Sequence, residues 1–375
     1  MPKTSQLLAI VYIILVSCGF LALLSASTVH DLDSSYYAKR QAIWSIVSII
    51  IAFLIRKIDY NIYKNFAIPI SLISIILLVL VLIPNIGKMV NGSWRWIQIG
   101  SITIQPSEFA KPSILILISY WLSNNQRKID EFKNGILIPY ILIGIFLVPI
   151  LLEPDYGTTI LIFFVTTILI FIAGANLKTI SIISIPVIVG IFVMILTNSE
   201  RLGRIMAFLK PESYQLSSGY QLANSLRAFS EGKLFGVGFG GSLQKYDYLP
   251  EAHTDFIFPI IGEEFGLVGC LSVVILYLIL FFLGINTSKN SYNTFGKFLG
   301  YGISLMIVVQ VVINLFVVTG LAPTKGIALP FISYGGSSIL SSSIMIGILL
   351  NISLDAERSS KKRKRGFFKN NYERK

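Results

Sequence analysis

Apolar runs of roughly twenty residues alternate with shorter polar segments along most of the chain. A helix needs about 20 mainly apolar residues to cross the hydrocarbon core of a bilayer. Such runs lie near residues 7–26, 41–55, 66–84, 106–123, 136–153, 157–174, 177–197, 257–284, 297–319 and 328–352. This pattern predicts an all-α polytopic membrane protein with ten transmembrane helices and with both termini on the same side.

Composition supports the same class of protein. Hydrophobic residues make up 54% of the chain and charged residues 13%, and the mean hydropathy is +0.73. These values exclude a water-soluble domain of this size. Cys18 and Cys270 both lie inside apolar runs without the spacing of a metal site, so neither a redox nor a zinc role is expected.

Basic residues set the predicted orientation. The formal net charge is +12, and most Lys and Arg residues fall in alternate connections together with Lys3 and the tail 358–375. Because cytoplasmic loops are enriched in Lys and Arg, both termini are predicted to be cytoplasmic. Residues 1–357 then form the membrane domain, and the tail is expected beside anionic membrane lipids. The tail has no aromatic residues patterned for stacking on bases, so nucleic acid is not an expected partner.

One connection, at about 198–255, is far longer than the others and falls on the predicted extracellular side, between helices 7 and 8. It is too polar and aromatic to span a membrane, and loops of this size usually carry function. Its arginines include Arg201, Arg204 and Arg227.

The segment NGSWRWIQIGSITIQPSEFAKPS, residues 91–113, is the first of four unusual polar motifs on that side. Asn91-Gly92 indicates a turn, and Trp94 and Trp96 suit a membrane interface. Glu108 and Lys111 lie on one helical face. A charge at the centre of a bilayer costs about 2.5–3.5 kcal/mol, so Lys111 is expected to face protein, water or a ligand. A purely structural pair with Glu108 is the alternative.

Two further motifs are EPDYGTT, residues 153–159, and GLAPTKGIALPFISYGGSS, residues 320–338. In the first, Asp155 could cap the following helix. In the second, prolines and glycines interrupt the helical pattern, and irregular backbone at this depth must be buried in protein or line a wet cavity. This segment supplies Lys325 and Ser333 as candidate site residues.

The fourth motif, YLPEAHTDFIFPIIGEEFGLVG at residues 248–269, places five titratable side chains at the membrane edge: Glu251, His253, Asp255, Glu263 and Glu264. Such a concentration indicates function. The alternative is that Thr254 or Asp255 caps a helix beginning at Phe256, with the two later glutamates pointing into the bundle.

These four motifs, in this order and on one side, resemble the SEDS family (shape, elongation, division and sporulation) over nearly the whole chain, and the division branch more than the elongation branch. The resemblance implies a membrane glycosyltransferase that polymerises lipid II into peptidoglycan on the outer face of the bacterial cytoplasmic membrane, at the division septum. It implies release of undecaprenyl pyrophosphate, with a class B penicillin-binding protein, the growing glycan strand and other division proteins as partners. An elongation-type polymerase and a lipid II flippase are the alternatives. The resemblance also implies a catalytic aspartate at Asp255 and functional weight on Glu108 and Lys111.

The implied inverting reaction needs a base for the acceptor hydroxyl and cations for the departing pyrophosphate. Asp255 is the predicted general base. The candidate substrate-binding cations are Lys111 and Arg95, followed by Arg204, Arg227 and Lys325. His253 could shuttle a proton or simply pack against the loop, and Trp94 and Trp96 could stack on sugars or sit at the interface. No cofactor is required by the sequence. A requirement for a divalent cation (Mg²⁺ or Mn²⁺) is left as an open alternative, although no group of acidic residues has the spacing of a metal-coordination site.

Overall fold

The computed structural model describes residues 3–26, 34–90, 93–100, 102–197, 199–214, 217–246 and 249–372. Its helices are α1 (Thr4–Ala26), α2 (Ser34–Ile55), α3 (Tyr60–Asn65), α4 (Ala67–Leu80), α5 (Pro106–Asn124), α6 (Ile138–Leu152), α7 (Tyr156–Ile172), α8 (Leu177–Leu196), α9 (Ser199–Leu209), α10 (Tyr220–Gly232), α11 (Ile257–Lys289), α12 (Thr294–Val318) and α13 (Gly336–Tyr372). Short 3₁₀ turns occur at Gln126–Lys128 and Pro211–Tyr214, and a π-helical stretch, Phe132–Leu137, leads into α6. Three strands complete the fold, namely β1 (Gly87–Val90), β2 (Ser93–Ile99) and β3 (Ile102–Ile104).

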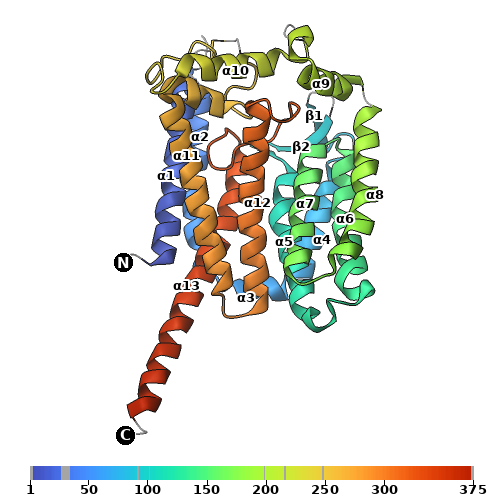
Figure 1. Ribbon diagram of the computed structural model, residues 1–375, viewed down its shortest axis with the longest axis vertical. Helices are drawn as coiled ribbons and strands as arrows, with labels where there is room; N and C mark the ends of the chain where they lie inside the picture. The colour runs from blue at the N-terminus through green and yellow to red at the C-terminus, as the bar shows by residue number, and fades with distance from the viewer. Residues whose placement is uncertain are drawn as a thin grey trace.

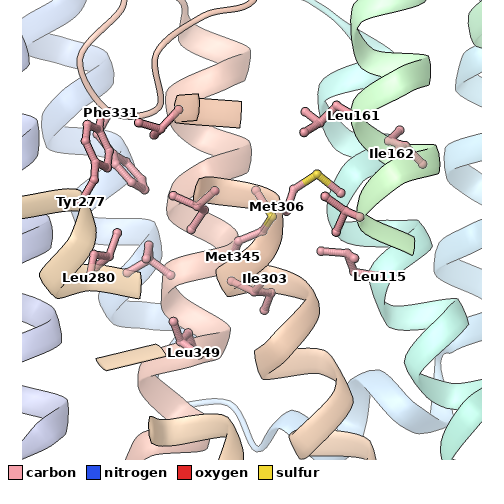
Figure 2. Close-up of a cluster of buried hydrophobic side chains, with 14 of the residues drawn as sticks. Leu115, Leu161, Ile162, Tyr277, Leu280, Ile303, Met306, Phe331, Met345 and Leu349 are labelled. Carbon is pink, nitrogen blue, oxygen red and sulfur yellow. The ribbon is translucent and has the colours of Figure 1, made fainter. Parts of the chain in front are cut away.

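The long helices run side by side as a bundle, and α9 and α10 lie across one end of it (Figure 1). α1 begins, and α13 leaves the bundle, at the opposite end. α12 is central, because it packs against α5, α7, α11 and α13. Their interface is filled by apolar side chains such as Leu115, Met306 and Met345 (Figure 2), each of them fully or almost fully buried.

Seven helices in the described part of the chain are long and apolar enough to cross a membrane. α4 and α7 are apolar but shorter, and α5, which carries Glu108 and Lys111, is not among the seven. The membrane character of the fold therefore agrees with the sequence, whereas the number of ten spans stays a prediction. The long connection at about 198–255 contains the amphipathic helices α9 and α10, and its extracellular placement also stays a prediction.

The expectation of an all-α fold is wrong in one place. β1, β2 and β3 form an antiparallel sheet, with Lys88 opposite Trp96 and Gln98 opposite Thr103. Residues 93–99 are rich in aromatic and β-branched side chains, which alternate with polar ones on either side of the Trp96–Ile97 step, and this composition favours a strand. The predicted turn at Asn91-Gly92 lies outside the described residues.

The last predicted span also begins later than expected. α13 starts at Gly336, and residues 320–335 before it contain turns, bends and irregular backbone without a helix. Pro330 and Gly335, whose φ is +158°, lie at the end of this stretch. The prolines and glycines that suggested irregular backbone therefore keep the whole segment out of the helix.

α11 is interrupted at Gly266, and another segment of the chain supplies backbone hydrogen bonds there. Gly266 has φ +65°, and a Cβ there would lie 2.5 Å from backbone atoms of Leu234. The N–H groups of Leu267 and Val268 donate to the carbonyls of Lys233 and Leu234, at 2.9 and 3.2 Å. In return, the carbonyls of residues 263 and 264 accept from the N–H groups of residues 237 and 238, at 2.9 and 3.0 Å. The segment 233–238 thus replaces the two helical hydrogen bonds that the break removes.

Candidate active site

Five separate stretches of chain converge at the end of the bundle that α9 covers. They are β2, the turn between α6 and α7, α9, the turn before α11, and the irregular segment 320–335. Motifs that are far apart in the sequence therefore meet in one place.

Asp255 lies in the turn 251–256, immediately before α11. The N-cap of α11 is Phe256, without a side-chain capping bond in the described structure, and Thr254 Oγ1 donates to Glu251 Oε2 instead, at 2.7 Å. The capping alternative for Thr254 and Asp255 is therefore wrong. The Asp255 side chain approaches Gly326 so closely that a Cβ at Gly326 would lie 2.6 Å from Oδ2.

The surroundings of Asp255 raise the pKa of its carboxyl group. Burial is the largest cause, the charges of Glu251, Asp155 and Glu108 add to it, and Arg95 acts in the opposite direction. Together they raise the pKa of Asp255 to about 7. A carboxylate with this pKa can accept a proton near neutral pH, which is the property expected of a general base.

Four basic side chains interact electrostatically with one another, and one of them, Arg95, also acts on Asp255. Lys325 packs against the start of α7, where a Cβ at Gly157 would lie 2.9 Å from its Cε. Burial lowers the pKa of Lys325 to about 8, Asp155 opposes this shift, and Arg201, Arg95 and Arg204 reinforce it. The ammonium is thus mainly protonated at pH 7, and the group forms a concentration of positive charge suited to an anion.

Two arginines of this group contact the α6–α7 turn and the first residue of α7. Arg95 Nε donates to the Glu153 carbonyl at 3.0 Å, and its Nη2 donates to the Pro154 carbonyl at 2.7 Å. The guanidinium of Arg201 lies 4.0 Å from the centre of the Tyr156 ring. Main-chain carbonyls and an aromatic face thus hold two cations beside the site.

The prediction that Asp155 caps α7 is confirmed. Its carboxylate accepts from the N–H of Thr158 at 3.1 Å and from the Thr158 hydroxyl at 2.7 Å. Glu153, two residues earlier, was not singled out from the sequence. It is fully buried, and burial followed by the charge of Asp155 raises its pKa to about 9, while Arg95 lowers it. The site therefore contains, besides Asp255, which is half ionised at pH 7, a carboxyl group that is mainly protonated at that pH.

The predicted pair between Glu108 and Lys111 is present and deeply buried. Lys111 is 2% exposed, and its Nζ lies 2.7 Å from Glu108 Oε1 and 3.0 Å from Gln310 Oε1. Both members of the pair are on the first turns of α5. In this conformation Lys111 is enclosed by protein, so its contact with substrate stays a prediction.

Sequence reasoning missed two amides of α12. Gln310 Nε2 donates to the Ala328 carbonyl at 2.7 Å while its Oε1 accepts from Lys111. Asn314 Nδ2 donates to the carbonyls of Asp255, at 2.9 Å, and Ile327, at 2.7 Å. The two residues thus join α5, the irregular segment and the catalytic candidate. The sequence contained a signal for them, because two amide side chains four residues apart inside an apolar run are unfavourable in a membrane unless they form hydrogen bonds.

The remaining candidates occupy different surroundings. The His253 ring lies 4.9 Å from that of Tyr37, and its carbonyl accepts from the N–H of Tyr334, which agrees with a packing role. Ser333 Oγ accepts from the N–H of Leu329 and closes a turn. The other three are Trp94 and Trp96, half-buried on β2, and Arg227, which is exposed on α10.

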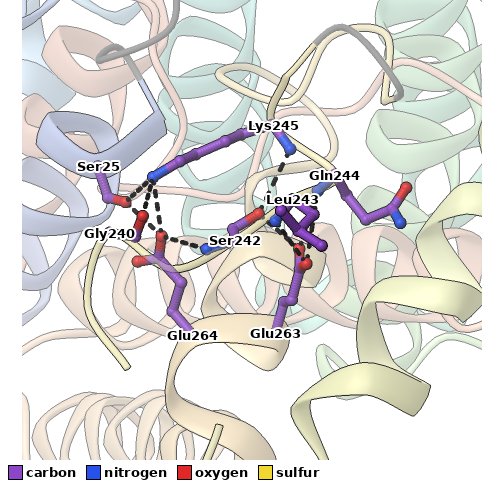
Figure 3. A network of polar contacts seen from close by, with 8 residues as sticks. All are labelled: Ser25, Gly240, Ser242, Leu243, Gln244, Lys245, Glu263 and Glu264. Atoms are coloured by element: carbon purple, nitrogen blue, oxygen red, sulfur yellow. Dashed lines mark hydrogen bonds and ion pairs between the residues drawn. The ribbon is translucent and has the colours of Figure 1, made fainter. Parts of the chain in front are cut away.

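The side chains of Glu263 and Glu264 point into the protein and bind the segment 242–245 (Figure 3). Glu263 accepts from Ser242 Oγ and from the N–H of Leu243, and Glu264 pairs with Lys245 at 3.3 Å. Lys245 Nζ also donates to Ser25 of α1 at 3.0 Å. These contacts make the two glutamates structural anchors of the segment 242–245.

Within the described part of the chain, no group of three or more His, Cys, Asp or Glu side chains is arranged to hold a metal ion. The carboxyl groups near Asp255 lie instead among basic side chains and backbone donors.

A family model described as cell cycle protein, covering FtsW, RodA and SpoVE, matches residues 5–358. The chain is 40% identical over 354 residues to a protein from Trichlorobacter lovleyi named probable peptidoglycan glycosyltransferase FtsW, with 92% of each chain covered. It is 39% identical over 359 residues to stage V sporulation protein E of Bacillus subtilis, covering 94% of this chain and 98% of that one.

Two solved structures share the fold. One is a chain in a structure of a peptidoglycan synthase complex that coordinates polymerization and crosslinking, with a TM-score of 0.75 at 24% identity over 93% of this chain and 97% of that chain. The other is the rod shape determining protein RodA of Thermus thermophilus, with a TM-score of 0.69 at 24% identity over 93% and 96% of the two chains.

Proposed function

The chain belongs to the cell cycle protein family of FtsW, RodA and SpoVE, and from this membership we propose that it is a peptidoglycan glycosyltransferase of the FtsW type. Family membership confirms the resemblance that the four motifs indicated. The protein is an integral membrane protein, since it combines this family with several helices of spanning length. Its proposed reaction is the polymerisation of lipid II into glycan strands on the outer face of the cytoplasmic membrane during septal wall synthesis.

One observation carries the proposal. Asp255, with a pKa raised to about 7, interacts with Arg95, which belongs to the same group of cations as Lys325, and its carboxylate lies against Gly326, the chain neighbour of Lys325. Glycosyl transfer from a lipid pyrophosphate needs this combination, because a proton leaves the acceptor while negative charge grows on the leaving group.

In the proposed reaction, the Asp255 carboxylate takes the proton of the acceptor sugar's 4-hydroxyl. The freed oxygen bonds to the anomeric carbon of the donor as the bond from that carbon to the pyrophosphate oxygen breaks. A single displacement of this kind inverts the anomeric configuration. Arg95, Lys325, Arg201 and Arg204 supply the positive charge that stabilises the departing undecaprenyl pyrophosphate.

The other side chains would support these groups. Asn314 fixes the backbone of Asp255, and the buried set of Lys111, Glu108 and Gln310 lies behind the irregular segment. Glu153, held neutral, keeps the negative charge near the pyrophosphate low. By its FtsW-like character, the protein would work with a class B penicillin-binding protein that cross-links the new strands.

The test is the polymerisation of lipid II by purified protein with its partner transpeptidase in detergent, where transport across a membrane cannot contribute. Asp255→Asn keeps the shape of the side chain but removes the base, so the rate should fall by roughly 10²- to 10⁴-fold. Asp130→Asn is the matched control, because it makes the same change at an exposed aspartate outside the site. It should stay within a few fold of wild type. An Asp255→Asn rate as high as that of the control would remove Asp255 as the base, and inactivity of the wild type would favour a flippase.

A further inference from the structure

An apolar surface lies on a segment that is not itself a membrane-spanning helix. We define the hydrophobic patch as Leu234, Phe235, Val237 and Phe239, together with Phe265 of α11. These apolar residues are highly exposed, with Phe235 79% exposed, Leu234 58% and Phe239 57%. Phe239 and Phe265 are in contact, with ring centres 6.3 Å apart. Exposed apolar clusters of this kind indicate a contact surface.

Backbone hydrogen bonds fix where this patch lies along α11. The segment 233–238 pairs with residues 263–268 across the break at Gly266, so its position relative to the helix is set. At 1.5 Å per residue, this pairing lies about 9–17 Å from the start of α11. The patch therefore cannot move away from the helix without exposing four backbone hydrogen bonds.

The length of α11 indicates where the hydrophobic patch lies relative to a bilayer. Its 33 residues make a helix of about 50 Å, whereas the hydrocarbon core is about 30 Å thick. The exposed apolar face of α11 runs from Phe265 to Phe282, through Val268, Leu271 and Ile275. This face is about 26 Å long and nearly fills the hydrocarbon core. The core then begins near Phe265, at the level of the hydrophobic patch.

Exposed basic side chains precede the patch along the chain, from the end of the bundle that α10 covers. Lys233 is exposed at the beginning of the segment, and Arg227 is exposed on the preceding helix α10. Aromatic and aliphatic side chains below cationic ones are the arrangement with which interfacial segments contact acyl chains and headgroup phosphates.

We propose that the hydrophobic patch inserts into the acyl-chain boundary of the leaflet on the active-site side, so that part of the long connection at about 198–255 is embedded in the membrane. The occupant is lipid, because the patch continues the lipid-facing surface of α11 at the same level. The same stretch of chain continues to Ser242 and Lys245, which are bound by Glu263 and Glu264 (Figure 3). The bilayer would thereby hold the connection at a fixed height.

Site-directed spin labelling tests this directly. In a background with Cys18→Ala and Cys270→Ala, single cysteines are introduced by Phe235→Cys and Phe239→Cys and labelled with a nitroxide. The full chain is reconstituted in vesicles of phosphatidylcholine and phosphatidylglycerol. Both positions are largely exposed, so the substitutions remove little packing. Collision rates with oxygen, which concentrates in lipid, and with a neutral nickel chelate, which stays in water, are then compared.

Two control positions frame the result. Ile279→Cys lies on the exposed face of α11 within the expected hydrocarbon core, and Ser230→Cys is exposed on the polar side of α10. The patch labels should favour oxygen over nickel, with a ratio between those of the two controls. A ratio equal to that of Ser230→Cys would place the patch in water and overturn the proposal. Labels that are immobile and shielded from both reagents would overturn it too, because a protein surface would then cover the patch.

Discussion

Replacing Lys111 by Met separates its structural role from any catalytic one. From the sequence alone, Met would be expected to leave folding nearly intact, because it keeps the length of the side chain and removes only the charge. The structure leads to a different expectation. Lys111 Nζ is the hydrogen-bond donor to both Glu108 Oε1 and Gln310 Oε1, and the buried Glu108 Oε2 has no hydrogen-bond partner within the described residues. Lys111→Met leaves Glu108 as an uncompensated buried acid.

The size of the effect follows from this burial. Removing one member of a buried ion pair destabilises a protein by about 3–5 kcal/mol, because the other charge stays desolvated. This corresponds to about a 10²- to 10⁴-fold change in the unfolding equilibrium. Glu108→Gln combined with Lys111→Met removes both charges and should recover much of this loss. The unsatisfied Gln310 Oε1 should keep a remaining cost of about 1–3 kcal/mol.

The free energy of unfolding can be measured by titrating the purified protein from dodecyl maltoside into dodecyl sulfate micelles. The wild type, both single variants and the double variant complete the thermodynamic cycle. Lys178→Met, at an exposed position, is the matched control and should change stability by no more than about 0.5 kcal/mol. The reasoning is refuted if Lys111→Met behaves like this control, or if the double variant loses the full sum of the single effects.

Three further results are expected. Polymerisation by the wild type should rise about fivefold from pH 6 to pH 7, because Asp255, with its pKa of about 7, loses its proton over this range. The rate should decline above pH 8, because the Lys325 ammonium, with its pKa of about 8, loses its charge. A flat pH profile would contradict both assignments. Gly326→Ala should lower the rate at least about tenfold with little loss of thermal stability, because the new methyl group displaces Asp255 Oδ2, whereas Gly144→Ala, which meets open space, should be silent in the same assay. Asn314→Leu should destabilise the protein by about 1–3 kcal/mol for each carbonyl left unpaired and should also slow polymerisation, and stability loss with an unchanged rate would show that the amide does not position the base.

Local patterns predicted local structure well. The spacing of Glu108 and Lys111 placed them on one helical face, and the position of Asp155 before an apolar run indicated a cap, because both interactions join residues within one turn. The family resemblance then identified Asp255 as the residue to examine.

Interactions between distant residues were not predictable in this way. Asn314 and Asp255 are 59 positions apart, and Gln310 and Lys111 are 199 apart, so spacing alone carries no information about their contact. The same limit applies to Glu153, whose neutral state depends on burial by surrounding elements. The cap was misassigned for a local reason. Glu251 adopts φ +57° and its carbonyl accepts from the N–H of Phe256, so the chain turns once more before α11 starts.

The local character of the Glu108–Lys111 pair has a consequence for the order in which the chain is made. α5 is synthesised long before α12, and at about 5–20 residues per second Gln310 emerges roughly 10–40 s after Lys111. During that interval a lone ammonium would oppose transfer of α5 into the lipid. Glu108 leaves the ribosome three residues ahead of Lys111 and can neutralise it as soon as the first turn of the helix forms. The ion pair therefore serves the nascent helix first, and only the finished bundle adds the contact from Gln310.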